Sequence, residues 1–193
     1  IPAMSCCAAP PRPSPAAATS ERYRTAGGKL DASIAQDGAV AAGFPGLPAA
    51  LVHVAEKYGR LPLSESLAPA IALARDGFPV YARLERGYAA RREVMERFPG
   101  TRQVYLAGGA PLKEGQLFRQ PDLARTLESL ARDGFDGFYR GPVAKKLVAG
   151  VRAEGGQWTA AELAAYRVRE REPLRFNYRG WEVVTAPPPS SGG

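Results

Sequence analysis

A series of amphipathic segments, most of them ending at or near a glycine, limits this chain to a mostly helical fold. Pro48 suits the first turn of one such helix, and Gly59 ends it. Leu51, Val52 and Ala55 line one face of that helix. The same pattern predicts further helices over residues 64–75, 81–98, 121–134, 142–154 and 159–166. Thr159 and Glu162 form a capping-box motif at the start of the last of these.

The hexapeptide LARDGF occurs twice, at residues 73–78 and 130–135. The flanking sequences do not match, so the repetition does not indicate a duplicated domain. A basic residue in the last turn, followed by glycine and an apolar residue, is typical of a helix C-terminus. We therefore expect Gly77 and Gly134 to end their helices in the left-handed conformation.

Short strands are expected on both sides of the helical region and once within it. Glycines break up residues 26–44, which we interpret as a hairpin followed by a turn at Pro45. Two short strands are predicted around Gly108, and a hairpin with its turn at Arg179 is predicted near residue 180. The charges alternate in sign over residues 167–175, which favours a solvated strand edge.

The charge pattern argues against a nucleic-acid partner. The formal net charge is +7, but the basic residues are scattered and interleaved with Asp and Glu. A nucleic-acid binder gathers its basic residues on one face. No stretch approaches the length of a membrane-spanning helix, and residues 1–19 lack the pattern of a signal peptide. The localisation cannot be read from this sequence.

The residues alone indicate no metal, no cofactor and no self-sufficient active site. Cys6 and Cys7 are adjacent, too close for an ordinary disulfide. The single histidine, His53, lies in an apolar helical run and is predicted to be packed or half-exposed. There is no phosphate-binding loop, nucleophile elbow or cluster with metal-ligand spacing.

Several motifs in a fixed order resemble the large subunit of the γ-glutamyltranspeptidase family. They are GFPG at 43–46, EKYGRLPLSESLAPAIALARDGFPV at 56–80, GFYRGPVAKKLV at 137–148, GGQWTAAELAAYRVREREPL at 155–174, YRGWEV at 178–183 and PPPSSGG at 187–193. The resemblance covers about four fifths of the chain.

The resemblance implies an α/β (α+β) fold, part of the αββα sandwich of an N-terminal nucleophile hydrolase, mostly helical in this stretch. The chain starts with Ile rather than Met, and in the family the sequence resembling PPPSSGG continues into further helices. We therefore expect the middle of a precursor, truncated at both ends. Residues 1–18 are expected to be an irregular or misread segment, and 19–193 a partial large-subunit domain.

The resemblance also implies an autoprocessing enzyme, with the nucleophilic threonine beyond Gly193. Such an enzyme cleaves γ-glutamyl amide bonds, as in glutathione, and passes the γ-glutamyl group to water or an amino acid through a threonine acyl-enzyme. The expected partner is the small subunit cut from the same precursor, with no cofactor and a periplasmic or extracellular location. This stretch alone is expected to be inactive.

One substrate-binding residue is expected within the chain. The family clamps the substrate α-carboxylate with an arginine in an R-E-x-A-P motif, and Arg12 is the only arginine near that place. Its motif departs from the pattern, since the Glu is absent and the proline is one position too close. Two other interpretations stay open: a cephalosporin acylase-like member of the superfamily, and a truncated non-catalytic helical protein.

Overall fold

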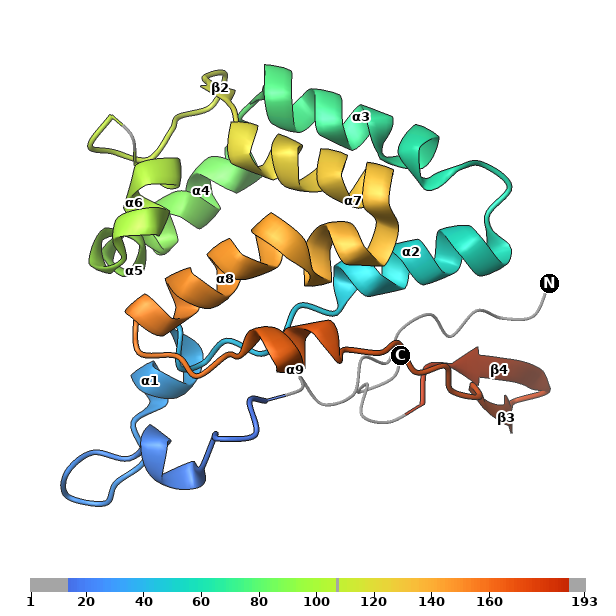
Figure 1. Ribbon diagram of the computed structural model, residues 1–193, viewed down its shortest axis with the longest axis horizontal. Helices are drawn as coiled ribbons and strands as arrows, with labels where there is room; N and C mark the ends of the chain where they lie inside the picture. Colours follow the sequence, from blue (N-terminus) through green and yellow to red (C-terminus); the bar gives the residue numbers. More distant parts are fainter. Residues whose placement is uncertain (1–13, 107, 188–193) are drawn as a thin grey trace.

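The computed structural model of this chain describes residues 14–106 and 108–187. Figure 1 shows a layered group of helices with short strands at its edges. The helices are η1 (Ser20–Tyr23), α1 (Ala32–Gln36), α2 (Leu47–Tyr58), α3 (Leu63–Asp76), α4 (Ala82–Ala90), α5 (Arg92–Arg97), α6 (Pro99–Tyr105), α7 (Pro121–Tyr139), α8 (Gly141–Ala153) and α9 (Ala160–Ala164). The strands are β1 (Phe78–Pro79), β2 (Leu117–Phe118), β3 (Leu174–Tyr178) and β4 (Trp181–Thr185).

Helix α7 is the centre of the main core, because α2, α3, α8 and α9 all pack against it (Figure 1). Its Leu130 and Tyr139 are almost completely buried, and so is Leu163 of α9. The other buried members of this core are Phe44, Ala49, Val52, Leu67, Ile71, Phe138, Ala144, Trp158 and Tyr166. The core therefore joins residues that are more than a hundred positions apart in the sequence.

Two buried aromatic residues fasten the segment before α2 to this core. The Tyr139 hydroxyl donates to the carbonyl oxygen of Pro45 (2.5 Å) and accepts from the amide of Ala49 (3.1 Å). The indole nitrogen of Trp158 donates to the carbonyl oxygen of Ala42 (3.1 Å). Burial raises the pKa of Tyr139, so its hydroxyl keeps its proton and stays a donor.

A second, smaller apolar cluster lies beside α4, α5 and α6. Strands β1 and β2 pair antiparallel, with Phe78 opposite Phe118. Phe118, Val80 and Tyr88 are buried there, and Tyr105 of α6 packs with its ring centroid 5.6 Å from that of Phe118. Burial raises the pKa of Tyr88 to about 12.

Most of the predicted helices and their ends are confirmed. Helices α2, α3 and α8 lie within one residue of the expected bounds. Gly77 (φ 92°) ends α3, and Gly134 (φ 57°) breaks α7, as both copies of LARDGF predict. The hairpin of β3 and β4 is also present, with its turn at Arg179 and Gly180.

The hairpin expected over residues 26–44 is wrong. The structure has one isolated bridge, between Arg24 and Leu30, followed by the short helix α1. The Asp31 carboxylate accepts from the amides of Ser33 and Ile34. This N-cap satisfies the first donors of a helix, which explains why the chain turns here instead of extending.

The single helix expected over residues 81–98 is interrupted at Arg91 (φ −110°, ψ 10°), which separates α4 from α5. Pro99 then starts α6, because proline fits the first turn of a helix, and α6 runs into the stretch before Gly108 where a strand was expected. Of the two strands predicted around Gly108, only β2 is found among the described residues. The helix expected over residues 159–166 ends at Ala164. In the charged run over residues 167–175, the strand begins only at Leu174.

No helix in the described ranges combines the length and apolarity that crossing a membrane requires.

Two glycines on neighbouring helices should respond oppositely to substitution by alanine. A Cβ on Gly137 would lie 2.1 Å from the carbonyl oxygen of Ser129, whereas a Cβ on Gly150 of α8 would meet nothing within 4 Å. We expect Gly137→Ala to lower the free energy of unfolding by about 1–3 kcal/mol. Gly150→Ala should raise it by about 0.5–1 kcal/mol, because alanine favours the helix.

Urea unfolding of the wild-type chain and of both variants, followed by circular dichroism, measures the difference. Equal effects of the two substitutions would contradict the close approach at Gly137.

Candidate functional site

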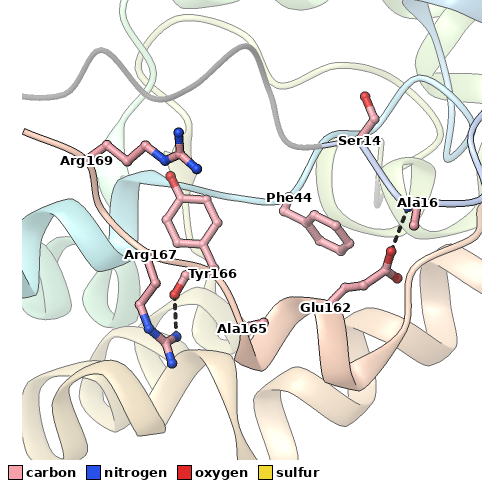
Figure 2. Close-up of a pocket in the computed structure, with 8 residues that line it drawn as sticks. All are labelled: Ser14, Ala16, Phe44, Glu162, Ala165, Tyr166, Arg167 and Arg169. Carbon is pink, nitrogen blue, oxygen red and sulfur yellow. Dashed lines mark hydrogen bonds between the residues drawn. The ribbon is translucent and has the colours of Figure 1, made fainter.

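A cavity of about 380 Å³ lies between α9 and the start of the described chain (Figure 2). Its volume is within the range of about 300–1,000 Å³ that is common for small-molecule sites. The residues that line it are Ser14, Ala16, Phe44, Glu162, Ala165, Tyr166, Arg167 and Arg169. It is thus built from three segments that are distant in the sequence.

Glu162 joins two of these segments. Its Oε2 accepts from the Thr159 hydroxyl (2.6 Å) and the Thr159 amide (3.2 Å), and the Glu162 amide donates back to that hydroxyl. This is the predicted capping box of α9, and it is confirmed. The other oxygen, Oε1, accepts from the amide of Ala16 (2.7 Å). The Thr159 hydroxyl, followed by the Ala16 amide, lowers the pKa of Glu162.

Arg167 closes the other end of α9. Its Nη1 donates to the carbonyl oxygens of Ala164 (2.9 Å) and Tyr166 (2.6 Å). Its guanidinium carbon also lies 5.7 Å from the ring centroid of Phe135. The last carbonyl groups of a helix lack partners within it, so Arg167 serves as a C-terminal cap.

Glu170 holds the segment after α9 against α2. Its carboxylate accepts from Lys57 Nζ (2.6 and 2.7 Å) and Tyr58 Oη (3.1 Å), and it lies 2.5 Å from His53 Nε2. The hydrogen bond from Lys57, then the one with His53, lowers the pKa of Glu170 to about 2. We call these four residues the Glu170 clasp.

The prediction for His53 is confirmed, since its side chain is 34% exposed and is paired with a carboxylate. No group of three or more potential metal ligands was found among the described residues.

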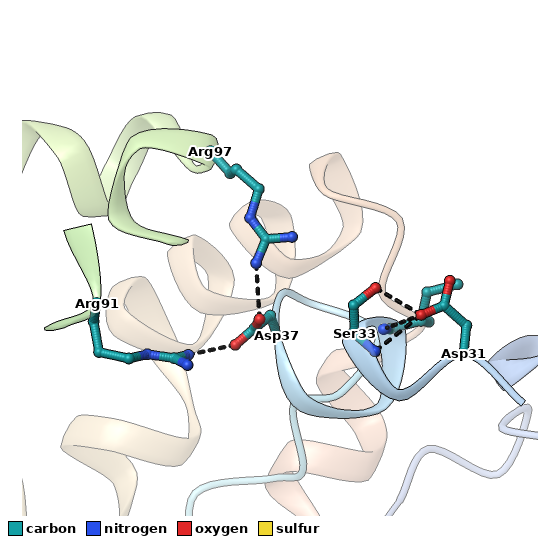
Figure 3. A network of polar contacts seen from close by, with 6 residues as sticks. Asp31, Ser33, Asp37, Arg91 and Arg97 are labelled. Carbon is teal, nitrogen blue, oxygen red and sulfur yellow. Dashed lines mark hydrogen bonds and ion pairs between the residues drawn. The ribbon is translucent and has the colours of Figure 1, made fainter. Parts of the chain in front are cut away.

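A second polar network lies away from the cavity and joins the loop after α1 to Arg91 and α5 (Figure 3). Asp37, which follows α1, accepts from Arg91 (2.5 Å) and Arg97 (2.8 Å), and its side chain is only 10% exposed. The hydrogen bond from Arg91 is the main reason that the pKa of Asp37 is lowered. The network holds α5 against the loop after α1.

Arg12, the site residue expected from the sequence, lies outside the described residues. Cys6, Cys7 and Gly193 also lie outside them. Ser14, two positions after Arg12, lines the cavity. Sequence reasoning missed the place of Arg169 at the cavity and the contacts of Glu170, because the run that contains them was interpreted as a solvated edge. The capping-box motif did point to Glu162.

The family model described as gamma-glutamyltranspeptidase matches residues 11–193. The chain belongs to this family. A glutathione hydrolase proenzyme from Pseudomonas sp. (strain A14) is 38% identical to it over 184 residues, which cover 93% of this chain and 31% of that protein.

Solved structures agree with this assignment. The γ-glutamyltranspeptidase of Helicobacter pylori, 33% identical, superposes with a TM-score of 0.89 over 93% of this chain and 52% of that one. The cephalosporin acylase of Bacillus halodurans, 34% identical, superposes with a TM-score of 0.74 over 79% of this chain and 30% of that one.

These matches confirm the expected fold class, an α/β part of an N-terminal nucleophile hydrolase. The chain spans about a third of the length of the curated relatives it matches.

The Glu170 clasp should make stability depend on pH in acid. The pKa of Glu170 is about 2 in the folded chain, against an ordinary value of 4.5. As the pH falls, Glu170 is therefore protonated in the unfolded chain at a higher pH than in the folded chain. The stabilisation by the clasp is complete above about pH 5 and is lost as the pH falls towards about 2. Glu170→Gln removes the charge and should flatten this part of the pH profile.

Urea unfolding between about pH 7 and about pH 3 measures the profile, with Glu172→Gln as the matched control on the same segment. The control should follow the wild type. Parallel profiles for Glu170→Gln and the wild type would rule out a stabilising role for the clasp.

Proposed function

We propose that this chain is part of the large-subunit region of a γ-glutamyltransferase or glutathione hydrolase precursor, with residues 19–193 forming a partial large-subunit domain. The observation that carries the proposal is the superposition on γ-glutamyltranspeptidase of Helicobacter pylori over 93% of the chain with a TM-score of 0.89. The name proenzyme, printed for the Pseudomonas relative, supports a precursor that is cut into two subunits.

In the proposed mechanism, cleavage of the precursor frees the α-amine of a threonine that we expect beyond Gly193. The α-amine is less basic than a lysine amine, and at hydrogen-bond distance it takes the proton of the threonine hydroxyl. The hydroxyl oxygen attacks the γ-glutamyl carbonyl carbon, and hydrogen-bond donors stabilise the resulting oxyanion. The amine leaves with a proton, and water or an amino acid then releases the γ-glutamyl group from the threonine ester.

The role of this chain in that mechanism is to build one wall of the site and to extend the sheet. The β3–β4 hairpin carries Leu174, Phe176 and Tyr178 on one face, with Trp181 opposite Tyr178. These side chains are exposed, Trp181 at 77%. Apolar surface of this kind marks an interface, and we assign it to the sheet contributed by the small subunit.

Arg12 remains the proposed clamp for the substrate α-carboxylate. A guanidinium is a planar fork that can donate two parallel hydrogen bonds to a carboxylate. Ser14, which follows two positions later in the sequence, lines the cavity and supports this proposal.

Cephalosporin acylase activity is the second candidate, because the Bacillus halodurans enzyme superposes with a TM-score of 0.74. That match covers 79% of the chain, whereas the matches to two γ-glutamyltranspeptidase structures cover 93% and 92%. We therefore favour γ-glutamyl substrates.

The full-length precursor tests the proposed function. We expect the purified protein to separate into two polypeptides on a denaturing gel, the smaller one starting with threonine by N-terminal sequencing. It should hydrolyse γ-glutamyl-p-nitroanilide. Replacing that threonine by alanine should abolish both the cleavage of the precursor and the hydrolysis of the substrate. Activity on an acylated cephalosporin alone would favour the acylase, and an uncleaved, inactive protein would support the non-catalytic alternative.

A further inference from the structure

Of the three charged side chains at the cavity, two already have hydrogen-bond partners within the protein. Both carboxylate oxygens of Glu162 accept hydrogen bonds from Thr159 and Ala16. Arg167 donates to two carbonyl groups at the end of α9. Arg169 is the third, and it forms no hydrogen bond or ion pair with any residue in the described ranges. Figure 2 shows it across the cavity from Glu162.

The position of Arg169 follows from its neighbour. Glu170 is fixed to three side chains of α2, with contacts of 2.5 to 3.1 Å. On the other side, Arg167 is fixed to the end of α9. Arg169 therefore lies on a short segment that is held at both ends, and its side chain lines the cavity.

The charge of the lining favours an anion. One carboxylate and two guanidinium groups leave a net positive charge, and the unpaired one is the planar donor suited to a carboxylate. A γ-glutamyl peptide carries two carboxylates, the α-carboxylate of the glutamyl group and the C-terminal carboxylate of the amine that leaves. The proposed function gives the first to Arg12, and the second is the carboxylate that we consider for Arg169.

We propose that Arg169 binds the C-terminal carboxylate of the leaving peptide and so favours γ-glutamyl peptides over neutral γ-glutamyl amides, with Glu170 as its positioning residue. This inference rests on the proposed function, because it assigns the cavity to the substrate of that reaction.

Two substrates of the processed full-length enzyme distinguish binding of the C-terminal carboxylate from a general effect of Arg169 on activity. Glutathione has the C-terminal carboxylate, and γ-glutamyl-p-nitroanilide has a neutral leaving group. We expect Arg169→Ala to raise KM for glutathione about tenfold, as for the loss of a charged hydrogen bond, with kcat nearly unchanged. Both parameters for the anilide should stay within about twofold. Arg169→Lys keeps the charge but not the planar fork, so its KM for glutathione should lie between those of the wild type and Arg169→Ala.

Arg171→Ala is the matched control, because Arg171 is exposed on the same segment and does not line the cavity. It should leave both substrates unaffected. An equal change on both substrates with Arg169→Ala, or no change on either, would overturn the inference while leaving the proposed function intact. A processed wild-type enzyme that cleaves neither substrate would overturn both.

The positioning role of Glu170 has its own readout. Glu170→Ala should raise KM for glutathione less than Arg169→Ala does, without affecting the anilide. In the double variant Arg169→Ala/Glu170→Ala, KM should equal that of Arg169→Ala alone, because Glu170 acts through Arg169. Additive effects would show that Glu170 acts independently and would reject this part of the inference.

Discussion

The hydroxyl of Tyr139 is the contact on which the main core depends. It supplies a donor to Pro45 and an acceptor to Ala49, two backbone groups at the start of α2 that are remote from it in sequence. A helix start leaves amides without intrahelical partners, and burying them unpaired is costly. The Tyr139 ring also stacks on those of Phe135 and Tyr166. One side chain thus places α2, α7 and the end of α9 relative to one another.

The parts of the fold that could be predicted are those decided by local chemistry. Helical spacing, the glycines at 77 and 134, and the Thr159 capping box each act within a few residues, so the sequence shows them directly. The break at Arg91 could not be predicted in this way. Arg91 pairs with Asp37, 54 positions earlier, and such a distant partner leaves no local pattern.

In the candidate site, too, contacts between residues distant in the sequence could not be predicted. Glu162 was predicted as a cap, but its second oxygen binds Ala16, 146 positions away. Glu170 lies in a run of alternating charge that is typical of a solvated edge, and its partner Lys57 is 113 positions away. The family resemblance did predict the fold class correctly, because it rests on many ordered motifs rather than on any one contact. The α-carboxylate clamp at Arg12 and the threonine nucleophile stay predictions.

The separation into two apolar clusters also bears on how the chain opens. Helices α4, α5 and α6 pack around Phe118 and Tyr88, apart from the core around α7. Strand β2 and the shared carboxylate of Asp37 connect this group to the rest. Cooperative units with few apolar contacts to their surroundings open at lower free energy than the whole protein. We therefore expect residues 82–105 to exchange their amide protons at a lower free energy of opening than the core around α7.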